Sequence, residues 1–198
     1  MTEWLLGLVP TYGLWLLGTA TFLSCLAIPI PASILMLAAG SFVAAGDLPL
    51  FGSALAAIAG ASLGDQVGYR IGQWGGAGLT RRLGSRASLI ERARAFLEKR
   101  GDLAVFLSRW LVSALGPYIN LAAGASGLSW IRFTLWGVLG ESVWTGLYVG
   151  LGYAFTGNLE AASDFAWEIL GFVGAGIVAL GLGYWLITAL KTSQSTEA

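Results

Sequence analysis

The stretch "SCLAIPIPASILMLAAG", Ser24 to Gly40, is apolar enough for a membrane interior, yet two prolines stand in its middle. Pro29 and Pro31 lack the amide proton that a helix needs, and their rings clash with the preceding turn, so they predict a break in the helix. In hydrocarbon, an unpaired backbone amide is costly and is tolerated only where protein or water covers it. The stretch therefore predicts a broken element that faces a covered, polar interior.

The composition places this break in a membrane protein. Of the 198 residues, 56% are hydrophobic and 11% are charged, and the apolar residues come in runs, as in a polytopic membrane protein. The net charge is zero, so we expect no nucleic-acid partner. With Cys25 as the single cysteine, neither an internal disulfide nor a cysteine-based metal cluster is expected.

The chain has no histidine. This removes the Ser-His-Asp triad, the commonest zinc ligand and the usual proton shuttle. A Ser-Lys dyad is also excluded, because Lys99 and Lys191 lie outside the apolar stretches. We therefore expect no catalytic residues, no metal and no cofactor, and predict that the protein is not an enzyme.

The apolar stretches and one basic segment give the organisation of a single membrane domain over residues 1–198. The apolar stretches cover about 4–22, interrupted by Pro10, then the Pro-broken stretch to 46, 48–72, 103–129 broken by "LGPYIN", 131–155 and 165–190. The core is expected at about 20–155, and the polar tail 191–198 is expected to be disordered.

The segment 77–102 is different, because it holds seven of the eleven basic residues. Leu89, Ala93, Phe96 and Leu97 fall at helical spacing, which predicts an amphipathic helix on the membrane surface. A solvated basic loop without a specific partner is the alternative. The positive-inside rule places this segment in the cytoplasm, which puts both chain termini in the cytoplasm and the connections near Asp47 and Glu160 outside.

The two halves of the sequence resemble each other. "PASILMLAAGS" and "GASLGDQVGYRIG" in the first half match "GPYINLAAGAS" and "GVLGESVWTGLYVG" in the second, with Gly64-Asp65 opposite Gly140-Glu141. With the topology above, the two Pro-broken elements enter from opposite faces, as in an inverted-topology repeat. The expected fold is thus all-α: an inverted-repeat pair of re-entrant helical hairpins plus transmembrane helices. A chance likeness between Ala/Gly-rich segments is the alternative.

The segments "AIPIPASILMLAAG", "GASLGDQVGYRIGQWGG" and "FLSRWLVSALGPYINLAAGASGLSWIRF" resemble the signature segments of the DedA family, the SNARE-associated or VTT-domain membrane proteins. The resemblance covers about residues 20–155. It implies a bacterial inner-membrane protein linked to the translocation of lipids such as undecaprenyl phosphate or phosphatidylethanolamine. Many members carry two acids where this chain has Ser24 and Ser33, so the resemblance leaves proton coupling in doubt. Asp65 and Arg109 match functional charges of the family.

Ionisable residues inside apolar stretches are functional candidates, because each costs about 2.5–3.5 kcal/mol to insert. Arg109 suits a phosphate headgroup, or else it pairs with Asp65 or Glu141 as a structural contact. Asp65 neutralises Arg109, carries a proton, or forms a purely structural ion pair. Glu141 is expected near mid-membrane as the partner of an arginine or as a protonated acid. Arg70 is a binding residue or an interface anchor.

Neutral residues near the breaks complete the expected site. Their side chains could donate hydrogen bonds to a headgroup, or they could satisfy backbone groups of the hairpins, which is the interpretation favoured for each alone. These residues are Ser24, Ser33, Ser113 and Asn120, beside the prolines Pro29, Pro31 and Pro117.

The leading hypothesis is an inner-membrane lipid transporter, or flippase, that moves a lipid with an anionic headgroup, undecaprenyl phosphate or a phospholipid. Its partners are membrane lipids that carry phosphate, with protons as a further partner, and the small-residue faces would permit a homodimer. The alternative is a proton-coupled transporter of a small ion or solute that uses Asp65 and Glu141. A scaffolding role is the remaining alternative, but it leaves the buried charges unexplained.

Overall fold

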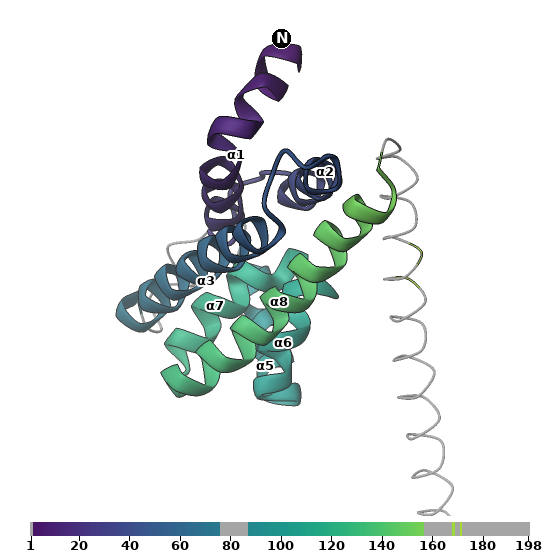
Figure 1. Ribbon diagram of the computed structural model, residues 1–198. Coiled ribbons are helices and arrows are strands. Elements are labelled where there is room, and N and C mark those ends of the chain that lie inside the picture. Colours follow the sequence, from purple (N-terminus) through teal and green to yellow (C-terminus); the bar gives the residue numbers. More distant parts are fainter. Residues whose placement is uncertain (1, 76–86, 157–167, 169–170, 172–198) are drawn as a thin grey trace, which may run out of the picture.

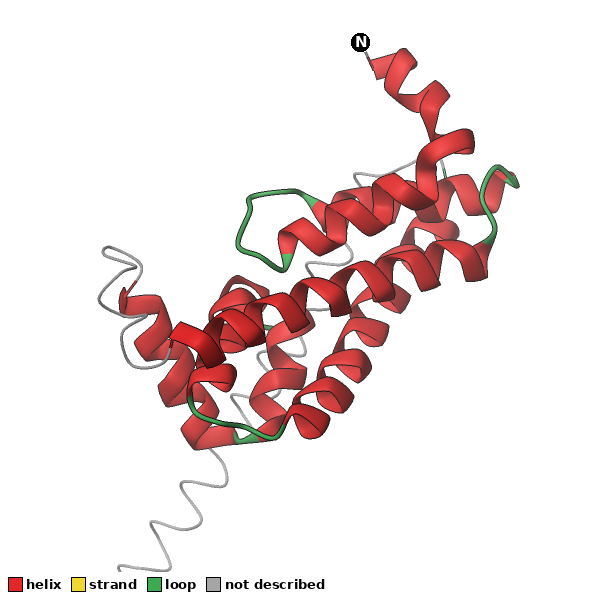
Figure 2. Ribbon diagram, turned by 90° about the vertical axis from the view of Figure 1, so that its left-hand side faces the viewer, coloured by secondary structure: helices red, strands yellow, loops and turns green. Residues whose placement is uncertain are grey.

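Every regular element that the structure describes is a helix. The computed structural model describes residues 2–75, 87–156, 168 and 171 (Figure 1). Figure 2 shows the same helices without a strand among the described residues. The expectation of an all-α fold is confirmed for this part of the chain. The expected apolar stretch 165–190, the tail 191–198 and the start of the basic segment fall largely or wholly outside the described residues.

The first half of the chain forms three helices: α1 (Thr2–Ser24), α2 (Ala32–Ala45) and α3 (Leu50–Gly75). The predicted break lies between α1 and α2, and α1 continues through Pro10 without interruption. Pro31 is the N-cap residue of α2. Gly46 ends α2 with a left-handed φ of 87° that glycine adopts without a steric penalty.

The second half forms α5 (Ala87–Arg100), α6 (Asp102–Trp110), the short 3-10 helix η3 (Ser113–Leu115), α7 (Gly116–Ala125) and α8 (Trp130–Ala154). Pro117 lies in the first turn of α7, where its missing amide proton leaves no hydrogen bond unmade. A break in the helix is thus found beside Pro31 and beside Pro117, as expected. Both residues start a helix, and the chain breaks before them.

The helices of the two halves pack in a crossed arrangement. Within the halves, α1 packs on α3 and α6 packs on α8, while α2 packs on α8 and α7 packs on α3 across the halves. Glycines allow these contacts: a Cβ atom on Gly40 or Gly152 would overlap the backbone across the α2–α8 contact, and one on Gly124 or Gly72 would do so across the α7–α3 contact. The two "LAAG" segments thus occupy equivalent positions, which supports the internal repeat.

The same contacts correct the register of the repeat. Gly72 corresponds to Gly152, and the residue seven positions earlier is Asp65 in α3 but Thr145 in α8. The expected match of Asp65 with Glu141 is wrong by one helical turn. The reason is that α3 carries glycine at every fourth position from residue 60 to 72, so a shift of one turn still aligns glycine with glycine.

The basic helix α5 is amphipathic as expected, but its apolar face has another partner. Ile90, Ala93 and Leu97 are buried in a core cluster that includes Ile119 and Ala122 of α7. The expectation that this face lies on the membrane surface is therefore wrong over residues 87–100. The protein itself covers the apolar face, and the charged face of α5 points outward.

Among the described helices, only α3 is both long and apolar enough to cross a bilayer by composition alone. Its large outward side chains are exposed, including Phe51 at 82% and Trp74 at 83%. The helix α8 has nearly the same length and exposes Ile131 and Leu135 in the same way. These apolar surfaces are typical of helices that face lipid.

Candidate functional site

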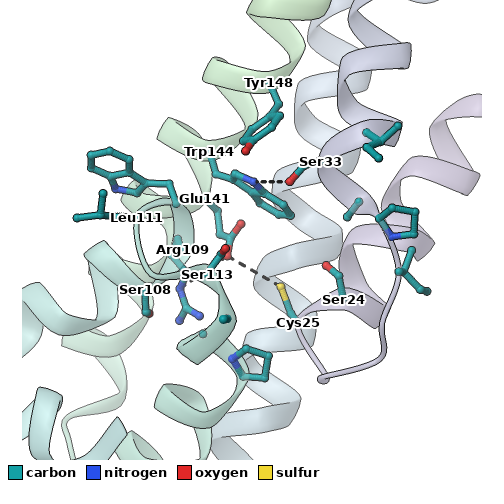
Figure 3. Close-up of a pocket in the computed structure, with 18 of the residues that line it drawn as sticks. Ser24, Cys25, Ser33, Ser108, Arg109, Leu111, Ser113, Glu141, Trp144 and Tyr148 are labelled. Carbon is teal, nitrogen blue, oxygen red and sulfur yellow. Dashed lines mark hydrogen bonds and ion pairs between the residues drawn. The ribbon is translucent and has the colours of Figure 1, made fainter. Parts of the chain in front are cut away.

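A cavity of about 650 Å³ lies where the two broken elements approach each other. In Figure 3, Ser24 and Cys25 lie on one side of it, Arg109 and Ser113 on the other. Both breaks contribute to its wall. The first contributes Ile28, Ile30 and Pro31, and the second contributes Leu111, Ser113 and Ala114. Three ionisable groups that the sequence places far apart, Asp65, Arg109 and Glu141, all line this cavity.

Arg109 is held at the end of α6 by the close approach of α6 to α8. A Cβ atom on Gly140 would contact Cγ of Arg109 and the backbone oxygen of Phe106, so only glycine leaves room for this side chain. Arg109 is 4% exposed, and Nη1 donates a hydrogen bond of 2.9 Å to Oδ1 of Asp65. Its guanidinium carbon lies 5.5 Å from the ring centre of Phe133, a further favourable contact for a cation.

Asp65 is fixed from a second side by Asn120. Nδ2 of Asn120 donates a hydrogen bond of 2.8 Å to the same Oδ1 atom that accepts from Arg109. Asn120 is fully buried on α7, and Gly68 of α3 makes room for its side chain. Because both donors share Oδ1, the second carboxylate oxygen of Asp65 has no hydrogen-bond partner among the described residues.

Glu141 completes a cluster with one positive and two negative groups. Its Oε1 atom lies 3.7 Å from Nε of Arg109, an ion pair without a hydrogen bond. Arg109 also has no hydrogen-bond partner at Nε and Nη2 among the described residues, and neither Oε2 of Glu141 nor Oδ1 of Asn120 has one. Buried polar atoms without partners are rare in proteins, so this concentration of them at a cavity indicates a place for a polar guest.

Cys25 belongs to this cluster, although no pattern in the sequence indicated that it lies at the site. Its Sγ atom lies 4.0 Å from Oε1 of Glu141. One ligand atom each from Cys25, Asp65 and Glu141 lie within 4.8 Å of one another, which is a spacing that could hold a metal ion. The guanidinium of Arg109 already neutralises one of the two carboxylates in the same cluster, and the expectation of no metal stays a prediction.

The neutral residues near the breaks play different parts. Oγ of Ser24 donates to the backbone oxygen of Thr21 at 2.8 Å, so Ser24 satisfies a backbone group as favoured from the sequence. Oγ of Ser33 instead accepts a hydrogen bond of 3.2 Å from Nε1 of Trp144, which joins α2 to α8. Ser113 lines the cavity from η3 and is exposed.

Three residues of the expected site lie elsewhere. Arg70 is exposed on α3, and its Nη1 donates a hydrogen bond of 3.1 Å to Oε1 of Gln73. Its assignment to the site is therefore wrong, and the alternative role of an interface anchor fits its position better. Pro29 is exposed in the link between α1 and α2 and does not line the cavity, unlike Pro31 and Pro117. Asn120 lies behind Asp65 and acts through it.

Sequence reasoning missed the aromatic wall of the cavity. Trp144 and Tyr148 follow Glu141 at helical spacing on α8 and line the cavity (Figure 3). Trp110, directly after Arg109, lines it as well. Their spacing of three and seven residues from Glu141 could have indicated that Trp144 and Tyr148 lie on the same face of the helix as Glu141. Trp110 and Cys25 could not have been found this way, because they lie in or beside the breaks, where helical periodicity does not apply.

Comparison with known proteins gives a consistent group of relatives. The VTT domain matches residues 30–154 of the chain. The uncharacterized membrane protein slr0232 of Synechocystis is 33% identical over 162 residues, covering 74% of this chain and 73% of that protein. The uncharacterized membrane protein YkoX of Bacillus subtilis is 27% identical, covering 85% and 77%, and protein DedA of Escherichia coli is 28% identical, covering 68% and 63%. No solved structure matches the chain.

Proposed function

Because the chain belongs to the VTT-domain family of bacterial membrane proteins, we propose that it moves a lipid with an anionic headgroup across the inner membrane. The two broken elements enter the bilayer from opposite faces and meet at the cavity. The headgroup passes through this cavity, and the acyl chains stay in the surrounding lipid. The substrate is undecaprenyl phosphate or a phospholipid.

One observation carries this proposal: Arg109 is buried at the wall of a cavity with two of its nitrogen atoms, Nε and Nη2, free of hydrogen bonds among the described residues. A guanidinium is always charged and presents its donors in a planar fork that fits two phosphate oxygens. Hydroxyl groups of Ser24, Ser33 and Ser113 lie on the same cavity and can contact further headgroup oxygens. Such a site binds and orients a phosphate without any covalent step.

Reconstituted protein tests this role directly. We expect Arg109→Ala to slow the movement of a fluorescent phosphatidylglycerol across proteoliposome membranes by about ten- to a hundredfold, because a charged hydrogen bond contributes about 1.5–3 kcal/mol. Arg109→Lys keeps the charge opposite Asp65 but loses the fork, so it should fold normally and still move the lipid slowly.

Arg132→Ala is the matched control, because Arg132 is an exposed arginine that pairs with Asp102 away from the cavity. Its lipid movement should equal that of the unchanged protein. Equal rates for Arg109→Ala, Arg109→Lys and the unchanged protein would remove Arg109 from the transport path.

The charge balance of the cluster favours one alternative. Two carboxylates, Asp65 and Glu141, face a single guanidinium, so a proton or another cation could neutralise the remaining charge. A proton-coupled transporter of a small ion or solute would use these two acids as carriers. A pH-dependent ion flux without any lipid movement, lost in both Asp65→Asn and Glu141→Gln, would support this function instead.

A further inference from the structure

We infer that the core consists of two bodies that move against each other, and that the Asp65–Arg109 contact is a latch between them, which an anionic headgroup releases. The first body is α1, α3 and α7, and the second body is α2, α6 and α8. The headgroup as the releasing agent rests on the function proposed above. The division into bodies and the latch rest on the packing alone.

The helices alternate between the bodies along the chain. The four most extensive helix contacts all lie within a body: α1 with α3 and α3 with α7 in the first, α2 with α8 and α6 with α8 in the second. Contacts between the bodies are less extensive, and the largest of them lies where α3 crosses α8. Each broken element is therefore shared, because α1 and α7 belong to one body while α2 and α6 belong to the other.

The glycine contacts follow the same division. Glycines that bring one helix against the backbone of another do so within the first body at Gly60, Gly64, Gly72 and Gly124, and within the second body at Gly40, Gly140 and Gly152. Such backbone contacts resist sliding and separation, since neither side has a flexible side chain that could adapt. The exception among the described residues is Gly116, the first residue of α7, where a Cβ atom would meet the backbone oxygen of Ser108 in α6, so this one contact joins the two bodies beside their link.

The contact between the bodies is made of side chains. At the α3–α8 crossing, a Cβ atom added to Gly137 would have side-chain atoms of Arg109 and Asp65 as its nearest neighbours. At the same crossing, the ring of Tyr69 stacks on the ring of Phe133 with 4.7 Å between the ring centres. A turn away from this stack, Arg109 of the second body donates to Asp65 of the first. Side chains can exchange partners where backbone contacts cannot, so this crossing is the place where the bodies can pivot.

The links between the bodies line the cavity. Residues 25–31 connect α1 to α2, residues 111–115 connect α6 to α7, and most residues of both links form the cavity wall. Ala27 in the first link has a φ of 62°, a left-handed conformation that is strained for an alanine. A change of angle at these links changes the cavity itself, so motion of the bodies and access to Arg109 are coupled.

The latch responds to an anion because the anion and the Asp65 carboxylate compete for the guanidinium of Arg109. Asp65 is held to the second body by the hydrogen bond from Nη1 of Arg109. A phosphate that enters the cavity and takes the guanidinium fork draws Arg109 away from Asp65, and Asn120 still holds Asp65 within the first body. The ion pair between the bodies is then lost, contacts such as that of Cys25 with Glu141 remain, and separation costs less.

Cys25 is a natural reporter for this motion. It is the single cysteine of the chain, it lies at the end of α1 in the first body, and its sulfur is 4.0 Å from Glu141 in the second. The measurement is the alkylation rate of Cys25 by a bulky maleimide divided by the rate for a small one. This ratio reports access alone, because both reagents attack the same thiolate.

In phosphatidylcholine vesicles, Asp65→Asn should raise this ratio by about tenfold, since it removes the charge that closes the latch. Asp102→Asn is the matched control, because Asp102 pairs with Arg132 within the second body, and its ratio should not change. The double variant Asp65→Asn/Arg109→Gln opens the same latch with the net charge kept, and serves if the single variant fails to fold. A ratio unchanged in every folded latch variant overturns the inference.

Phosphatidylglycerol vesicles separate the latch from its releasing agent. If a headgroup releases the latch, the unchanged protein should show a higher ratio in phosphatidylglycerol than in phosphatidylcholine, and Asp65→Asn should show no further rise. If the ratio of alkylation rates rises with Asp65→Asn but not with phosphatidylglycerol, the result supports the two bodies and overturns this headgroup as the releasing agent. That outcome contradicts the proposed lipid without contradicting the latch.

Discussion

Arg109 has an unusual position for a charged residue, because it is nearly fully buried beside two carboxylates and an open cavity. Burying charges costs free energy that pairing repays only where the remaining hydrogen bonds are also made. Here several donors and acceptors of Arg109, Asp65 and Glu141 are left without partners. Stability alone gives no reason for such an arrangement, whereas a site that binds an anion needs free donors.

The pairing of Asp65 with Arg109 can be tested by a double-mutant cycle. Arg109→Gln leaves two buried carboxylates unpaired, and removing one partner of a buried pair typically costs about 3–5 kcal/mol. Asp65→Asn should also destabilise the protein, but less, since Glu141 still faces the guanidinium. The double variant should be more stable than the sum of the two losses predicts, measured by thermal unfolding in detergent. Additive losses would mean that the two side chains do not interact.

At the scale of the elements, glycine decides which helices pair. The α2–α8 and α3–α7 contacts both bring a glycine of each helix against the backbone of the other. An apolar face alone would allow each helix several partners, but a backbone contact of this kind fits only one. The fold of the core therefore depends on a few positions where even a methyl group is too large.

Two helical glycines, the buried Gly40 and the exposed Gly146, should respond to alanine in opposite ways. In Gly40→Ala, the new methyl group overlaps the backbone of Val149 and Gly152, and overpacking of this kind costs about 1–3 kcal/mol or more. In Gly146→Ala, the methyl group meets open space, and the helix gains about 0.5–1 kcal/mol. The melting temperature should fall in the first variant and stay level or rise in the second.

Gly124→Ala provides a check on the repeat, because Gly124 occupies the position in α7 that Gly40 occupies in α2. Its melting temperature should fall as in Gly40→Ala. A fall in only one of the two would show that the α2–α8 and α3–α7 contacts are not equivalent.

For the molecule as a whole, the crossed packing makes each broken element a connection between bodies. Residues 25–31 and 111–115 lie at equivalent places in the two halves and on the same cavity. Two such links in one molecule change their angles together if the bodies move as units. This shared motion is the physical route by which a local change at Arg109 reaches both faces of the protein.

Hydrogen exchange measures this coupling. We expect amides of residues 25–31 and 111–115 to exchange faster than those of α2 and α8 where Gly40 meets Gly152, because the links have isolated turn hydrogen bonds in place of a continuous helical ladder and adjoin the cavity. Asp65→Asn should speed exchange in both links by a similar factor. Faster exchange in one link only would mean that the links open independently.

Several features could be predicted from the residues alone, because their causes are local. A charge in an apolar run is costly wherever the chain folds, which identified Arg109, Asp65 and Glu141 as site candidates. Proline has no amide proton to donate, which predicted a break near residues 29–31 and another near 117. Arg70 was included for the same reason as Arg109, since the cost of a charge does not reveal which side of a helix carries it.

The sequence by itself thus determined an all-helical membrane chain with two breaks and a small set of buried charges, since hydrophobicity, helix breaking and the cost of a charge act within a few residues. Only the tertiary structure decided that α2 pairs with α8 and α7 with α3, that Asp65 aligns with Thr145, and that Cys25 and Trp144 join the cavity. These outcomes depend on how closely two backbones approach. Residues 40 to more than 100 positions apart fix that distance together, and no local pattern contains it.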